Sequence, residues 1–262
     1  MSYRTICLLG TVLTGLFVSG CGTPSAWRTR PIADTSSLKD KATIVVPVKG
    51  SPISLQDPQA LNSVFIGILG VAIKEAVADK PKREALVKKI GEVSAFSSEQ
   101  VLAEECVDIL KTSGWNPGTN VTLYSGLEVM HGAGPEIEGE TRVFKTTYSV
   151  GDLLTWKHAY TKWMNCGPMH TFSTNDYSSG PFVILEVTIW TPLVKSGHLY
   201  LGAMMKVMDP ITGQCLASGT AGKDAPVRPL KQAEDLGSFV EDFRKCARAL
   251  SEQLLKQLKV IP

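Results

Sequence analysis

The sequence lacks the signatures of the common enzyme classes. It contains no HExxH, no GxSxG and no P-loop. Its paired carboxylates, such as Glu104-Glu105 and Glu241-Asp242, are adjacent in sequence, and adjacent residues on a helix do not face each other. We therefore expect a non-catalytic protein without a cofactor.

The positive and negative charges of the sequence nearly balance, and side chains that could bind a metal are few. The chain has 27 Lys and Arg against 25 Asp and Glu, a net charge of +2, so no strong field draws it to nucleic acid. Cys166-x-x-x-His170, with His158 nearby, does not provide the four closed ligands of a structural zinc site. The sequence predicts neither a nucleic-acid partner nor a metal.

Hydrophobic runs long enough to span a membrane are missing, and the first short run lies at the amino end. Ile6 to Val18 is shorter than the ~20 residues of a spanning helix, and it follows the basic residue Arg4. This pattern is typical of a secretory signal, with an uncleaved anchor helix as the alternative. The run closes in Leu-Phe-Val-Ser-Gly-Cys21-Gly22, which resembles the lipobox of bacterial lipoproteins. The resemblance implies cleavage of residues 1–20 and a lipid on Cys21.

The lipobox predicts both location and domain organisation. Gly22, rather than Asp, follows Cys21, which by resemblance to enterobacterial sorting implies the outer membrane, with the protein facing the periplasm. Residues 21–41 are polar and contain prolines, as in a flexible tether. Residues 42–262 are then expected to form a single α/β domain with an inserted loop region at 131–181.

Four later cysteines would lie in an oxidising compartment. Cys106, Cys166, Cys215 and Cys246 allow two disulfides in three pairings. The alternative is reduced core cysteines, because Cys106 and Cys246 fall on apolar faces of predicted helices.

Apolar periodicity predicts the main elements of the domain. The expected strands are 42–48, 121–124, 182–190, 199–207 and 214–220. Ser97-x-x-Gln100 and Ser238-x-x-Glu241 are capping-box patterns that predict the starts of two helices. The second of these is a long C-terminal helix, and Pro81 is expected to break a charged stretch at 74–92.

Two stretches are candidates for contact with a partner. In the 131–181 excursion, Asp152 could cap a helix bearing aromatic side chains, and aromatic residues dominate binding hot spots. The candidate residues there are Trp156, Tyr160, Trp163 and His170; the alternative is that the aromatics anchor the loop to the domain. The second stretch, 64–73, is apolar all round and is either a buried helix or a patch formed by Phe65, Ile66 and Leu69.

The order of elements predicts an α+β or α/β fold, a mixed sheet of about four to five strands covered by helices. It resembles the anticodon-binding-like domain of envelope lipoproteins such as the curli secretion lipoprotein and the activators of penicillin-binding proteins, and of the amino-terminal domain of TolB. The matching pieces are 44–48, 182–188, 205–213 and the final helix. No membrane-barrel hairpins accompany them, so the resemblance implies a fold but no pore and no particular partner.

Our leading hypothesis is a lipid-anchored envelope protein that presents a protein-binding surface for assembly or transport, with a homo-oligomer left open. The first alternative is an envelope enzyme, such as a cell-wall hydrolase, with a site in the 131–181 excursion. The second is a carrier of lipid or a small ligand that uses the apolar stretch 64–73.

Overall fold

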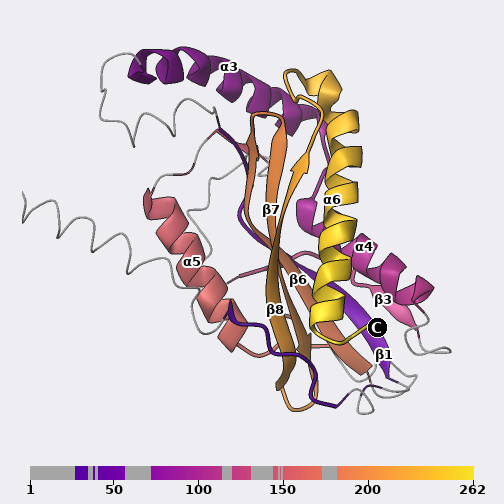
Figure 1. The fold of residues 1–262 in the computed structure, drawn as a ribbon. Helices are drawn as coiled ribbons and strands as arrows, with labels where there is room; N and C mark the ends of the chain where they lie inside the picture. Colours follow the sequence, from indigo (N-terminus) through magenta and orange to yellow (C-terminus); the bar gives the residue numbers. More distant parts are fainter. Residues whose placement is uncertain are drawn as a thin grey trace, which may run out of the picture.

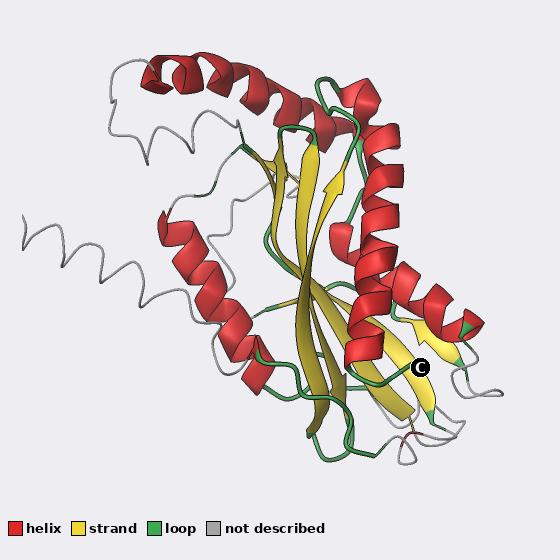
Figure 2. Cartoon of the chain, in the orientation of Figure 1, coloured by secondary structure: helices red, strands yellow, loops and turns green. Residues whose placement is uncertain are grey.

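The computed structural model describes residues 27–34, 38, 41–56, 72–113, 120–130, 144–146, 148, 150–172 and 182–262. The leader 1–20, the lipobox cysteine Cys21 and the apolar residues Phe65, Ile66 and Leu69 lie outside these ranges. Most of the described chain forms one curled mixed sheet with helices on both faces (Figures 1 and 2).

The sheet has eight strands, more than the four to five that the sequence predicts. Its long strands are β1 (Ala42–Lys49), β6 (Phe182–Lys195), β7 (His198–Met208) and β8 (Cys215–Pro226). The short strands are β2 (Ile53–Leu55), β3 (Val121–Leu123), β4 (Glu128–Val129) and β5 (Phe144–Lys145). Strands of two or three residues are too short to show an alternating pattern, so most of them escaped the sequence analysis.

The sheet combines a parallel half with an antiparallel meander. Strand β1 runs parallel to both β3 and β6, whereas β6, β7 and β8 pair antiparallel in order. The β6–β7 turn is Ser196-Gly197, with φ of 52° and 74°. Both residues are left-handed, as a tight two-residue hairpin turn requires.

Helices α4 (Ser98–Thr112) and α6 (Leu236–Gln257) cover one face of the sheet, while α5 (Val150–Asn165) covers the other (Figure 1). Alternate residues of each long strand therefore enter two separate cores. Along β6, for example, Leu185 packs with α4 and α6, whereas Ile184 packs with α5. The four described helices include the long C-terminal helix that the sequence predicts.

Of the two helix starts that capping-box patterns predict, one is confirmed and the other is not. The Ser97 side chain does accept a hydrogen bond from the Gln100 amide, so the predicted start of α4 is confirmed. Helix α6, however, begins at Leu236, and Ser238 lies inside it. A short 3-10 turn, Ala233–Asp235, with its own capping box at Gln232 and Asp235, precedes α6 and makes a second cap unnecessary.

Pro81 does not break its helix. It lies inside α3 (Ala72–Val93). Proline removes one backbone hydrogen bond from a helix, and the exposed neighbours Lys80 and Lys82 show that solvent reaches this turn.

Part of the expected tether lies against the domain. Arg30 forms a two-way backbone bridge with Ser218 on the edge of β8, and the buried residues Trp27, Ile32 and Leu38 join the cores. Apolar side chains at these three positions explain the attachment, which polar composition alone did not predict.

Candidate binding groove

The aromatic residues of α5 lie inside the protein. Trp156, Tyr160 and Trp163 have exposed fractions of 9%, 1% and 2%, and they pack on β1, β6 and β7. The predicted helix of the 131–181 region is present, but its aromatic face anchors it to the sheet. These three residues therefore form no accessible binding surface.

A buried ion pair fixes the end of α5. Lys206 and Glu186 have fully buried side chains, with 3.1 Å between Nζ and Oε2. The Trp163 indole donates to Glu186 Oε2, the Met169 amide donates to Oε1, and Lys206 Nζ donates to the Trp163 carbonyl at 2.9 Å. The pair therefore joins two strands to the loop that follows α5.

A second polar cluster surrounds Gly50, where β1 ends. The Tyr160 hydroxyl donates to the Ile189 carbonyl at 2.6 Å and accepts from the Ser51 amide at 2.7 Å. The Gly50 amide donates to Glu99 Oε1 at 2.9 Å. Burial raises the pKa of Glu99 and that of Tyr160. The cluster is enclosed by protein, so we assign it a structural role.

His170 is held in a contact of its own. Its Nδ1 lies 2.9 Å from Glu128 Oε1, and its ring packs between Tyr124 and Phe172, with centroid distances of 4.5 Å and 4.4 Å. His170 therefore joins the loop after α5 to β4 and is half-buried. The sequence did not indicate its partner, because Glu128 lies 42 residues away.

All four described cysteines are free thiols. Cys106 and Cys246 are buried beneath α4 and α6, where burial raises the pKa of the thiols to about 12 and about 11. Cys166 is exposed and Cys215 is half-buried. Within the described ranges, no group of three His, Cys, Asp or Glu side chains could hold a metal ion. None of the helices described is long and apolar enough to cross a membrane.

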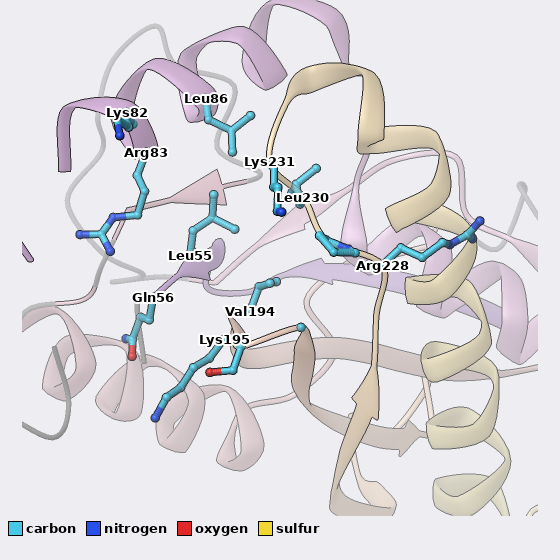
Figure 3. Close-up of a pocket in the computed structure, with 13 residues that line it drawn as sticks. Leu55, Gln56, Lys82, Arg83, Leu86, Val194, Lys195, Arg228, Leu230 and Lys231 are labelled. Atoms are coloured by element: carbon cyan, nitrogen blue, oxygen red, sulfur yellow. The ribbon is translucent and has the colours of Figure 1, made fainter. Parts of the chain in front are cut away.

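A groove of about 480 Å³ opens at one end of the sheet (Figure 3). We call it the basic groove. Four segments line it: Leu55-Gln56 at the end of β2, 82–86 on α3, 194–197 at the β6–β7 turn, and 228–231 between β8 and α6. These segments are far apart in sequence and meet only because the strand ends and α3 converge here.

The floor of the basic groove is apolar. Leu55, Leu86 and Leu230 converge from three different elements in Figure 3, and Val194 lies beside them. Leu55 is 6% exposed and belongs to the larger core, against which Leu86 and Leu230 also pack. The floor is therefore an extension of the core that is open to solvent.

The described lining residues of the groove include several cations and no carboxylate. Five of its lining residues are basic: Lys82, Arg83, Lys195, Arg228 and Lys231. Neither Lys195 nor Lys231 forms an ion pair with any residue that the structure describes. These two ammonium groups remain available to an anionic ligand.

Arg228 differs from the other cations of the rim. Its guanidinium contacts Asp242 at 2.9 Å and Glu241 at 2.8 Å on α6, toward which it points in Figure 3. The hydrogen bonds from Arg228 lower the pKa of Asp242 to about 2. Arg228 thus fastens the 228–231 segment to α6 and shapes one wall of the groove.

The polar side chains of the groove are mostly basic. Its only hydroxyl group is on Ser196, in the exposed turn, and no histidine or carboxylate lies among its lining residues. In the sequence, the only indication of this site is the segment Arg228-Pro-Leu-Lys231, which combines basic and apolar residues.

No protein-family model matches the chain, and no curated protein is similar to it at a significant level. Among solved structures, the chain is similar to the PelC dodecamer from Paraburkholderia phytofirmans and to a point variant of that dodecamer. Each is 9% identical with a TM-score of 0.37, over 88% of this chain and 96% of the other. At this level of similarity, function has to be argued from the residues of this chain.

Proposed function

We propose that this chain is a non-catalytic, lipid-anchored protein of the bacterial outer membrane that holds a partner protein in its basic groove. The lipobox at Cys21 supports the anchor and the compartment, with the domain facing the periplasm. The groove carries the functional part of the proposal, because it combines an apolar floor with the ammonium groups of Lys195 and Lys231, with which no described carboxylate pairs.

This combination fits a segment of protein with both apolar and acidic side chains. Burying apolar surface contributes roughly 25 cal/mol per Å², so filling the floor would supply most of the affinity. An exposed ion pair contributes only about 0.2–1 kcal/mol. The lysines of the rim therefore select an acidic partner and orient it more than they strengthen binding.

The test is a pull-down from detergent-solubilised envelope, with the double variant Lys195→Glu/Lys231→Glu beside the unchanged protein. Lys111→Glu on α4, outside the groove, is the matched control. We expect the groove variant to lose a protein that the control retains. If the two variants retain the same proteins, the groove is not the binding surface. Measuring the size of the isolated protein in the same experiment tests whether it forms a homo-oligomer.

The anchor is tested separately. Cys21→Ser should leave the precursor uncleaved and remove the lipid, which mass spectrometry of the purified protein would detect. An unmodified Cys21 in the native protein would contradict the lipoprotein assignment without bearing on the groove.

A further inference from the structure

The outer face of α5 differs from an ordinary solvent-facing helix. It exposes two leucines, Leu153 and Leu154, with exposed fractions of 39% and 62%. Lys157, His158 and Lys162 are exposed on the same helix. Asp152 is the only acidic residue of α5, and Lys145 contacts it at 2.7 Å. The exposed face therefore combines apolar and basic side chains without a free carboxylate.

The amino-terminal segment is fastened to this same helix. The Trp27 indole donates to the Thr161 hydroxyl at 3.2 Å, and the Trp27 ring packs against Tyr160. Cys21 precedes Trp27 by six residues. A fully extended chain spans ~3.3–3.6 Å per residue, so Cys21 lies within about 20 Å of Trp27. A lipid on Cys21 would hold α5 close to the bilayer, and α4 and α6 lie on the opposite side of the sheet (Figure 1).

We propose that the outer face of α5 rests on the anionic lipid surface beside the anchor and so sets the orientation of the domain. The inference depends on the lipid anchor of the proposed function. Apolar side chains with neighbouring lysines are typical of helices that lie in a membrane interface, and basic side chains attract anionic headgroups. The contact is weak by itself, but the anchor makes it intramolecular, so few side chains are needed to orient the domain.

The test uses the lipidated protein reconstituted in vesicles of phosphatidylethanolamine, with or without phosphatidylglycerol. A fluorescent label is attached at Leu154→Cys on α5 or, as the matched control, at Glu252→Cys on α6. Both variants carry Cys166→Ser and Cys215→Ser, which remove the accessible native thiols. We expect brominated lipids to quench the label at position 154 but not the label at position 252, with stronger quenching when phosphatidylglycerol is present.

A charge variant sharpens the test. Lys157→Glu/Lys162→Glu should abolish the dependence on phosphatidylglycerol, whereas Lys245→Glu/Lys256→Glu on α6 should not. Equal quenching at positions 154 and 252, or none at 154, would overturn the proposed orientation and leave the groove untouched. Protein that fails to partition into vesicles would overturn the anchor as well. A change at position 154 that needs envelope extract, or higher protein concentration in detergent, would identify a partner protein or a second copy instead.

Discussion

Lys206 and Glu186 form an ion pair that is fully buried between α5 and the sheet, with 3.1 Å between Nζ and Oε2. The other contacts of this pair reach Trp163 in the last turn of α5 and the loop that follows the helix. The pair and the aromatic side chains around it together fasten α5 to the domain.

The ion pair predicts a strong coupling between its two members. Lys206→Met leaves the Glu186 carboxylate buried without a cation, so we expect it to lower the free energy of unfolding by about 3–5 kcal/mol. Glu186→Leu added to Lys206→Met should restore much of that loss, because the double variant has no unpaired charge. Urea unfolding of the two single variants and the double variant measures the coupling. Strictly additive effects would contradict it.

Trp163 is buried, so we expect its removal to lower stability, whereas removal of an exposed residue of the same helix should not. Trp163→Ala should lower the free energy of unfolding by about 3–5 kcal/mol, as expected for a large buried aromatic. Leu154→Ala, on the exposed face of the same helix, should change it by less than about 0.5 kcal/mol. Thermal or urea unfolding provides the comparison. If the Trp163→Ala protein kept normal stability but lost its partner, the aromatic residues of α5 would instead form a binding surface, as the sequence analysis proposed.

The packing around Gly50 leaves no room for a side chain. A Cβ atom at this position would lie 1.9 Å from the Ile189 carbonyl oxygen, which is backbone and cannot move aside cheaply. We expect Gly50→Ala to cost more than about 3 kcal/mol, among the largest effects of single substitutions. Gly237→Ala in α6 is the control, because nothing lies within 4 Å of its added methyl group. That change should be neutral or stabilise by up to about 1 kcal/mol.

Glu99 predicts a dependence of stability on pH. Burial raises the pKa of Glu99 above its ordinary value of 4.5, so the native state holds this proton more tightly than the unfolded state. The contribution of Glu99 to stability is therefore greatest below pH 4.5 and is lost as the pH rises through the raised pKa. Glu99→Gln cannot titrate, so its unfolding free energy should decline less over this range. Urea unfolding at several pH values measures the two slopes, and equal slopes would remove Glu99 as their cause.

The sequence predicted the elements with long periodic patterns and missed those held by distant contacts. Phe239, Phe243 and Leu250 recur at helical spacing, and they form the buried face of α6. The strand pattern of 182–190 and 199–207 likewise reappears in β6 and β7. By contrast, the short strands β2 and β5 form through distant contacts. Strand β2 pairs with β6, and β5 pairs with β2.

The candidate site was harder to predict, because it too depends on contacts between residues that are distant in sequence. The aromatic pattern of Trp156, Tyr160 and Trp163 indicates a helix face but does not say whether that face meets protein or solvent. The basic groove depends on Leu55, Lys195 and Lys231, which only the folded sheet brings together. No local pattern in the sequence places those residues side by side.

The central claim is that the basic groove holds a partner protein, and site-specific photo-crosslinking in living cells tests it most directly. A photoreactive amino acid is placed at position 195 in the groove or at position 111 on α4, which does not line the groove. We predict a discrete adduct of higher mass from position 195, absent from position 111 and lost when Lys231→Glu is added. The absence of an adduct at 195, or the same adduct from both positions, would contradict the claim.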